Sequence, residues 1–218
     1  MEVAISQLRE RGYDAVTMRS IAQELGTGPA SLYAHVANRA ELDRLVVSRV
    51  AAQWRIPDPD PERWEQQVKE CFTELLGIYR ENPGVARCSM GMIPVDVEAL
   101  TVMERFVALL KAGDVADQHI AWFVDVSMLF VGSVAMEEDI WRERAREAHP
   151  GEDAEELEEA QVADVHDVFA GLPPDRFPLL QAMAGVMTTG DGDQRFGFGV
   201  DLLLGGLKAL SAGRRSAP

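Results

Sequence analysis

Helical periodicity runs through almost the whole chain. Apolar residues recur every three or four positions, as at Ile21, Ala22 and Leu25 and again from Leu42 to Val50. This spacing places them on one face of an α-helix. No segment shows the two-residue alternation, bounded by hairpin turns, that a half-buried strand needs. The sequence therefore predicts an all-α protein.

The expected helices end at residues that seldom continue a helix. Gly12, Gly26 and Gly113 suit helix C-termini, and Pro150 stops the helix before it. Residues 151–161 are an acidic run that we interpret as a solvated face or loop. The predicted helices span residues 2–11, 18–25, 29–35, 39–50, 62–81, 84–91, 95–112, 116–147, 162–170, 176–188 and 194–211.

The distribution of charge is more informative than its total. The chain has 21 basic and 36 acidic residues and a net charge of −15, which argues against nucleic acid as a partner. Seven arginines and six acids, however, give +1 over residues 1–56, which leaves −16 for the remainder. The change coincides with the segment PDPDP at 57–61, which is either a functional boundary or an ordinary helix end. Only the N-terminal part is suited to meet a polyanion.

The stretch from Thr17 to Arg39 is the most specific pattern in the chain. Ala22 is small where two helices cross, Gly26 permits the positive φ of a tight turn, and Leu32 inserts into the shared core. Two helices joined in this way form a helix-turn-helix, whose short second helix lies in the major groove of DNA. On spacing alone, an ordinary helical corner is the alternative.

The two helices have expected caps and an expected inner face. Thr17 and Asn38 are suited to the N-cap positions of the helices that follow them. Leu25, Leu32 and Val36 are expected to take the apolar side. The remaining side chains of the second helix are then free to face DNA.

The free face carries chemistry that suits DNA. Arg19 and Arg39 have the reach to contact phosphates or a guanine edge. Tyr33 and His35 can donate to phosphate oxygens, although Tyr33 alone also fits a half-buried packing role. The predicted DNA-binding residues are Thr17, Arg19, Gly28, Pro29, Ala30, Ser31, Tyr33, Ala34, His35 and Arg39.

The segment AVTMRSIAQELGTGPASLYAHVANRAELDRLV resembles the N-terminal domain of the tetracycline-repressor (TetR) family of one-component bacterial regulators. The similarity covers residues 3 to about 50, and FGFGVDLLLGGLKAL resembles the last helix of tetracycline-repressor-type members. It implies a homodimeric repressor that binds a palindromic operator on double-stranded DNA. A small-molecule effector held in a C-terminal helical domain would release it. A cytoplasmic setting is expected separately, because two cysteines cannot staple the fold.

The resemblance also assigns roles to residues. It implies that Arg19 and Ser31 contact bases, and that Arg39 replaces a phosphate-contacting lysine. Gly28 and Ala34 stand where many members carry larger side chains, which reduces the number of groups able to read bases. The alternative function is therefore a helical small-molecule-binding or scaffold protein with weak or lost DNA binding. The residues implied to line the groove are Pro29, Ala30, Tyr33, Ala34 and His35.

We expect two domains, a helix-turn-helix domain at 1–47 and a ligand-binding and dimerisation domain at 48–218. Methionines and aromatic residues are frequent in the second, where they fit either an adaptable pocket or ordinary core filling. Asp125 fits either a polar anchor for the ligand or a solvent-facing position. The predicted lining is Phe72, Met90, Met92, Phe106, Asp125, Met128 and Met136.

No cofactor, metal or catalytic site is expected. The chain lacks a nucleophile elbow, a phosphate-binding glycine loop and a dinucleotide fingerprint, and its four histidines lack metal-ligand spacing. Cys71 and Cys88 are interpreted as buried apolar residues. The position that best matches the pocket histidine of the tetracycline repressor falls near Cys88–Ser89. We therefore expect a largely apolar effector rather than magnesium–tetracycline.

Dimerisation is predicted to use residues 118–145 and 194–211. The last helix is apolar on more than one face and contains glycines that permit close helix approach. Burial of this helix within one subunit is the alternative. No stretch approaches 18 uncharged apolar residues, so a membrane span is not expected.

Overall fold

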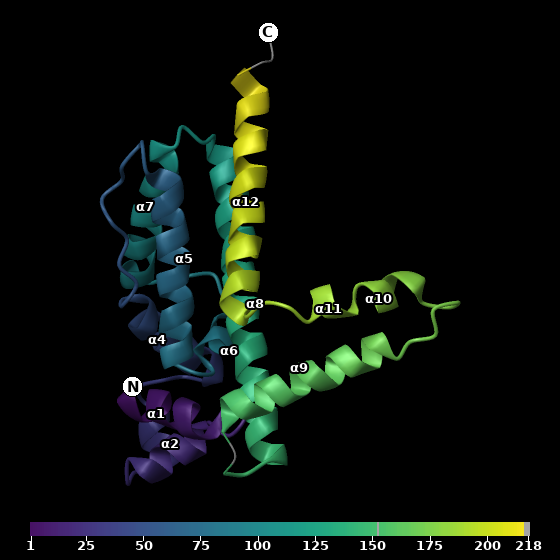
Figure 1. Cartoon of the computed structure of the whole chain (residues 1–218). Helices are drawn as coiled ribbons and strands as arrows, with labels where there is room; N and C mark the ends of the chain where they lie inside the picture. The colour runs from purple at the N-terminus through teal and green to yellow at the C-terminus, as the bar shows by residue number, and fades with distance from the viewer. Residues whose placement is uncertain (152, 216–218) are drawn as a thin grey trace. The chain divides into compact units, whose positions relative to one another are not determined.

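A computed structural model shows that the chain is built from helices (Figure 1). It describes residues 1–151 and 153–215 and places no strand among them, which confirms the predicted fold class. The contacts divide the chain into two units, Met1–Asp139 with Gly199–Pro218, and Ile140–Phe198.

Four helices form the N-terminal head of the first unit, which we define as residues 2–51. Ala4, Ile5 and Leu8 of the first helix and Ile21 and Ala22 of the second are buried. The predicted domain boundary at residue 47 falls inside the fourth helix. The helices are α1 (Glu2–Arg11), α2 (Met18–Glu24), α3 (Pro29–Tyr33) and α4 (Arg39–Ala51).

The rest of the first unit is a helical bundle. Helix α5 packs against α7, and α4 of the head packs against both α6 and α7. Phe72, Phe106, Leu109 and Leu110 have no measurable exposure and form the centre of the bundle. Its helices are α5 (Trp64–Glu81), α6 (Val85–Ser89), α7 (Val97–Ala112), the part of α8 (Asp117–Ala148) up to Asp139, and the part of α12 (Gly192–Arg215) from Gly199.

The chain between head and bundle is not a free linker. Residues 54–60 carry no helix, as the prolines predict. Trp54 and Ile56 are nevertheless buried, and the Trp54 indole Nε1 donates to the Cys71 carbonyl oxygen over 2.8 Å. The connection therefore holds the head to α5.

The second unit has little apolar core of its own. Helix α9 (Ala154–Ala170) contacts α10 (Pro178–Ala182) and α11 (Ala184–Met187). Among the described side chains of this unit, Ala184 and Phe196 are the buried apolar ones. The large exposed apolar residues are Trp141, Val162, Val165, Val168, Leu179, Leu180, Met183, Val186, Met187 and Phe198.

In the second unit one alternative for the acidic run is excluded and one helix prediction is wrong. The acidic run is not a loop, because α9 starts at Ala154 and contains most of it. Acidic side chains near a helix N-terminus interact favourably with the helix dipole, which explains the longer helix. The predicted helix 176–188 is divided at Met183, whose backbone angles (φ −95°, ψ 0°) lie outside the helical region.

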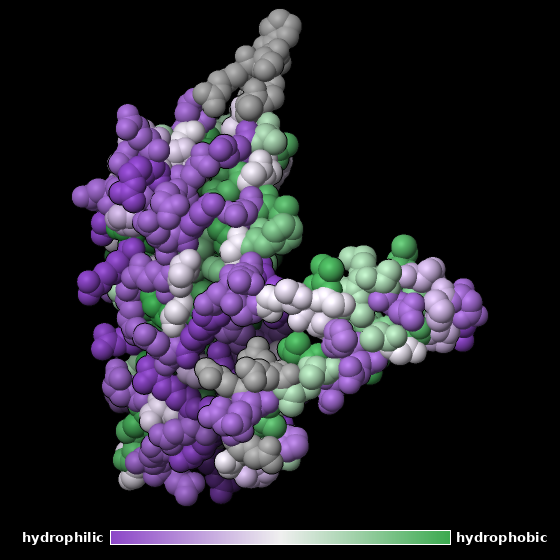
Figure 2. Space-filling view, viewed as in Figure 1, coloured by the Kyte–Doolittle hydropathy of each residue, from purple (hydrophilic) through white to green (hydrophobic). Residues whose placement is uncertain are grey.

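Helices α8 and α12 meet closely in the first unit. A Cβ added at Gly199 would lie 2.3 Å from a ring carbon of Phe130, so a larger residue there would require the ring to move. The other side of α12 is apolar and exposed, as Figure 2 shows. By length and composition α8 resembles a membrane span, with 33% of its most apolar window buried, which on its own is weak evidence. The expectation that the chain has no membrane span therefore stays a prediction.

Candidate functional site

Helices α2 and α3 form the predicted helix-turn-helix. Thr17 caps α2 by accepting from the Ser20 backbone N–H over 2.9 Å, and the Ser20 hydroxyl accepts from the Thr17 N–H in return. Gly26 has φ +66°, and Pro29 occupies the first turn of α3. Asn38 caps α4 through the Glu41 N–H. The predicted caps at Thr17 and Asn38, the positive φ of Gly26 and the predicted helix start at residue 29 are confirmed.

The packing inside this motif follows the prediction with one exception. Ala22 is fully buried where α2 meets α3, Val36 is buried, and Leu32 is half-buried. Leu25 was predicted to face inward, but 49% of it is exposed. Helix α2 ends at Glu24, so Leu25 occupies the C-cap and leaves the inner face.

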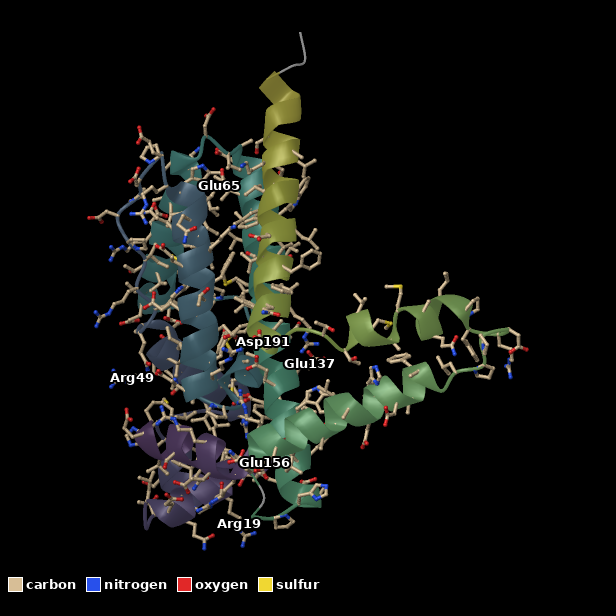
Figure 3. The ribbon with its side chains drawn as sticks, viewed as in Figure 1. Arg19, Arg49, Glu65, Glu137, Glu156 and Asp191 are labelled. Carbon is tan, nitrogen blue, oxygen red and sulfur yellow. The ribbon has the colours of Figure 1, made fainter. Side chains whose placement is uncertain are left out.

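The recognition helix α3 buries none of its residues. Nine of the ten predicted DNA-binding residues, all except Arg39, are exposed. Tyr33 is 52% exposed, which makes its hydroxyl available to a phosphate. Arg19 also lies on the exposed side of the head, as Figure 3 shows. The structure therefore leaves nine of the predicted residues, Arg19 among them, accessible to DNA.

Arg39 differs from the other nine because its guanidinium turns toward the head. Its Nε donates to Asp43 Oδ1 over 2.6 Å, and its Nη1 donates to the Val16 carbonyl oxygen. The guanidinium carbon lies 4.2 Å from the centre of the Tyr13 ring. The phosphate contact predicted for Arg39 requires these bonds to be exchanged for DNA.

The bundle places some of the predicted effector residues together. The Phe72 and Phe106 ring centres are 5.3 Å apart, and Phe72 also lies 6.1 Å from Phe123. Trp54, which was not predicted, lies 5.2 Å from Phe106. An aromatic cluster therefore joins α5, α7, α8 and the connector.

The remaining predicted lining residues are more scattered. Met90, Met92, Met128 and Met136 are half-buried. The Met90 sulfur approaches α8, because it lies 3.8 Å from the place where a Cβ of Gly132 would stand. Asp125 is exposed, which fits its solvent-facing alternative in the isolated chain.

Sequence reasoning missed a polar pair beside these residues. The Tyr79 hydroxyl lies 3.5 Å from Ser89 Oγ, and burial raises the pKa of Tyr79. Ser89 Oγ also donates to the Ala86 carbonyl oxygen over 2.7 Å. Nothing in the sequence indicated that Tyr79 meets Ser89.

A polar junction closes the turn between α5 and α6. Buried Asn82 accepts from Arg9 of the head over 2.6 Å and donates to the Ile78 carbonyl oxygen over 2.8 Å. The Gly84 N–H donates to Asp139 Oδ2 over 2.7 Å. Head, α5 and α8 are thus tied together at the start of α6.

A surface depression of about 280 Å³ lies elsewhere, along the outer side of α5. It contains none of the predicted lining residues, and three of the residues around it are charged. Its residues are Arg55, Ile56, Pro57, Glu70, Cys71 and Glu74.

The described part of the chain also bears on the expectations for metal ligands and cysteines. Among the described residues, no group of three or more His, Cys, Asp or Glu side chains is arranged to hold a metal ion. Cys71 and Cys88 are both buried free thiols, as predicted. Burial raises the pKa of each to about 12, so neither is a thiolate nucleophile at neutral pH.

Comparison with known families identifies both parts of the chain. Residues 1–43 match the sequence model of the bacterial regulatory proteins of the tetR family. Residues 56–211 match the tetracyclin repressor-like C-terminal domain. The second match alone covers most of the chain.

Individual relatives agree with this assignment. The HTH-type transcriptional repressor DrrR1 of Streptomyces coeruleorubidus is 29% identical over 100% of this chain and 80% of its own length. The tetracycline repressor protein class D of Escherichia coli is 26% identical over 95% of this chain and 87% of its own length.

Solved structures give the same result. Apo ActR from Streptomyces coelicolor superposes with a TM-score of 0.82 at 33% identity, covering 98% of this chain and 94% of its own. ActR in complex with actinorhodin superposes with a TM-score of 0.83 at 34% identity, covering 96% and 95%.

Proposed function

The chain belongs to the TetR family of bacterial regulators, and we propose that it is a ligand-responsive repressor that binds a palindromic operator as a homodimer. The observation that carries this proposal is the capped helix-turn-helix, whose recognition helix buries none of its residues. If α3 were only part of an ordinary helical corner, we would expect it to bury an apolar face. The scaffold alternative is not favoured.

In the DNA complex, Arg19 and Ser31 are proposed to read bases while Tyr33 and His35 hold phosphates. Arg19 is exposed, and among the described residues it forms no hydrogen bond or ion pair that would compete with DNA. The shortness of Gly28, Ala30 and Ala34 lets the α3 backbone approach the groove. Part of the specificity then comes from DNA shape.

Operator binding is tested with the duplex that the protein selects from a random-sequence library. Arg19→Gln is expected to weaken binding by roughly tenfold or more, since one arginine–base contact contributes about 1–3 kcal/mol. Arg49→Gln is the matched control, because Arg49 is an exposed head arginine that pairs with Glu2 (Figure 3). Equal affinities for both variants, measured by fluorescence anisotropy, would contradict the assignment.

The effector is proposed to be an aromatic, largely apolar molecule with a few polar groups. ActR, a relative, has been solved with actinorhodin bound. In this chain the aromatic cluster, Met90 and the Tyr79–Ser89 pair supply apolar contacts and two hydroxyls of matching chemistry. The cytoplasm is the compartment in which such a repressor meets both effector and operator.

A thermal-shift screen that includes actinorhodin tests this class of effector. A saturating binder is expected to stabilise the protein by a few kcal/mol. Met90→Ala is expected to reduce that shift, whereas Met183→Ala, exposed in the second unit, keeps it. If polar compounds stabilise the protein and aromatic ones do not, the proposed class is wrong.

The dimer is proposed to form through α8 and α12. Trp122, Val126 and Leu129 make an exposed apolar stripe on α8, and Leu202 and Leu210 continue it on α12. Gly205 and Gly206 have open space at their Cβ positions, which permits close approach of a second copy. Light scattering of the Trp122→Glu, Leu202→Glu double variant is expected to show a monomer.

A further inference from the structure

Two guanidinium groups lie close to the Tyr13 ring. Tyr13 belongs to the turn that joins α1 to α2 of the helix-turn-helix. The Arg39 guanidinium carbon, from α4, lies 4.2 Å from the ring centre, and that of Arg87, from α6, lies 4.8 Å from it. These separations are within the range of cation–π attraction. The ring therefore joins the head to the bundle.

A buried carboxylate holds this arrangement together. Asp43 accepts from the Tyr13 hydroxyl over 2.9 Å, from Arg39 Nε over 2.6 Å and from the Cys88 thiol over 3.6 Å. Burial and the bond to Asp43 raise the pKa of Tyr13, so the phenol stays protonated and donates. Arg87 also pairs with Asp14 over 3.0 Å, next to Tyr13 in the turn.

Arg39 also bonds the backbone of the turn that precedes α2, the first helix of the helix-turn-helix. Arg39 Nη2 lies 3.4 Å from the Tyr13 carbonyl oxygen, and Nη1 donates to the Val16 carbonyl oxygen. Thr17, the N-cap of α2, follows directly. Arg39 and Tyr13 therefore hold the segment that leads directly into the cap of α2.

We propose that Arg39 and Arg87 are positioning residues that clamp Tyr13 and thereby fix the orientation of the helix-turn-helix on α6. Arg39 serves operator binding through Tyr13, not through a phosphate. The proposal rests on the operator binding proposed above. It adds that the spacing of the two recognition helices depends on side chains that never touch DNA.

Half-site spacing is the measurement that separates positioning from general stability. A dimer with rigid heads binds best at one separation of its half-sites. Arg87→Gln removes the bundle's cation from the clamp while leaving Arg39 and Asp43 in place. Arg49→Gln is the control, because it also removes one positive charge per chain from an exposed ion pair. Each variant is tested on the selected operator and on versions with one base pair inserted or deleted between half-sites.

Arg87→Gln is expected to lose roughly three- to thirtyfold in affinity for the selected operator, as loss of a cation–π contact of about 0.5–2 kcal/mol predicts. When one base pair is inserted or deleted between the half-sites, the affinity of Arg87→Gln should fall by a smaller factor than the affinity of the wild type. Arg49→Gln should keep the wild-type spacing preference. An Arg87→Gln protein with the wild-type preference would overturn the proposal.

Variants of Tyr13 test the ring itself. Tyr13→Phe and Tyr13→Trp keep an aromatic face and are expected to keep the spacing preference, whereas Tyr13→Leu is expected to lose it. Leucine and tryptophan both lack the hydroxyl bonded to Asp43, so their difference reports the ring alone. Equal behaviour of Tyr13→Leu and Tyr13→Trp would contradict the clamp.

The salt dependence of binding tests the role of Arg39. If Arg39 contacted a phosphate, Arg39→Gln would lower the salt slope by roughly 0.9 per lost contact. We expect a slope equal to that of wild type together with relaxed spacing. A reduced slope with unchanged spacing would overturn the proposal. Arg39→Lys keeps the charge and checks that the fold tolerates a change at this position.

Hydrogen exchange without DNA keeps the clamp separate from the proposed function. Arg87→Gln is expected to speed amide exchange at residues 13–17 relative to Arg49→Gln. Faster exchange combined with a wild-type protein that binds no duplex would overturn operator binding and leave the clamp standing. Unchanged exchange would overturn the clamp whatever the DNA result.

Discussion

The head and the bundle of the first unit hold their shapes in different ways. In the head, α2 and α3 depend on local devices: a capping box at Thr17, a positive φ at Gly26 and a proline at the start of α3. In the bundle, Phe72 and Phe106 from separate helices are fully buried against each other. The head can therefore expose its recognition helix to a ligand as large as DNA, while the bundle depends on burial.

The largest expected effect tests this difference with two aromatic residues. Phe106→Ala should lower the free energy of unfolding by about 3–5 kcal/mol, because it removes a buried ring and leaves a cavity. Tyr33→Ala, at a residue that is 52% exposed, should change stability by about 0.5 kcal/mol or less. Urea unfolding measures both. Similar losses would show that α3 is part of a core.

The next largest effect on stability is expected at Gly26, compared with Gly28 two residues later. Gly26→Ala is expected to cost about 1–2 kcal/mol, because alanine disfavours the left-handed backbone at φ +66°. Gly28→Ala should cost little, since Gly28 has φ −76° and open space around its Cβ position. Thermal unfolding of the two variants compares them directly. If Gly28→Ala lost more stability than Gly26→Ala, then Gly28 rather than Gly26 would be the position of the turn that requires glycine.

The capping box predicts a smaller loss. Thr17→Ala removes the side-chain acceptor for the Ser20 N–H and is expected to cost about 1 kcal/mol. Thr17→Ser keeps that acceptor and should restore most of the stability. Denaturant unfolding with both variants checks the prediction. If serine fails to rescue, then packing of the threonine methyl group, rather than the cap, stabilises α2.

The two regions also differ in how far sequence reasoning reaches. Thr17, Gly26 and Asn38 act on backbone within four residues of themselves, so their roles follow from local rules. Leu25 was misplaced because the helical period was extended past the last residue of α2. The error is therefore one of a single residue at a helix end.

Arg39 shows where local reasoning ends. Its reach and the lysine that it replaces in the TetR family suggested a phosphate contact, yet its partners are Tyr13 and Asp43, with Arg87 close to the same ring. These groups come from three separate segments, and no spacing rule connects them. The Tyr79–Ser89 pair was missed for the same reason. Long-range side-chain pairing requires the packed structure.

The smallest effect on stability is expected at Asp96, which joins the bundle to the head. Asp96 caps α7 by accepting from the Ala99 N–H over 2.9 Å, and it also accepts from Ser48 of α4 over 2.6 Å. Burial alone would raise the pKa of Asp96, but the bonds from Ser48 and Ala99 outweigh it and the pKa is lowered from 3.8. The carboxylate therefore stabilises the folded protein above pH 3.8, and this stabilisation is lost as the pH falls through the lowered pKa.

Asp96→Asn isolates the charge, because asparagine caps a helix about as well as aspartate. Its stability should fall below that of wild type at neutral pH, by less than in Thr17→Ala. The gap should narrow below pH 3.8, when measured by denaturant unfolding across the acidic range. Ser48→Ala provides the control, since it removes the bond from α4 and keeps the cap on α7. A gap that does not depend on pH would mean that shape, rather than charge, joins head and bundle at this point.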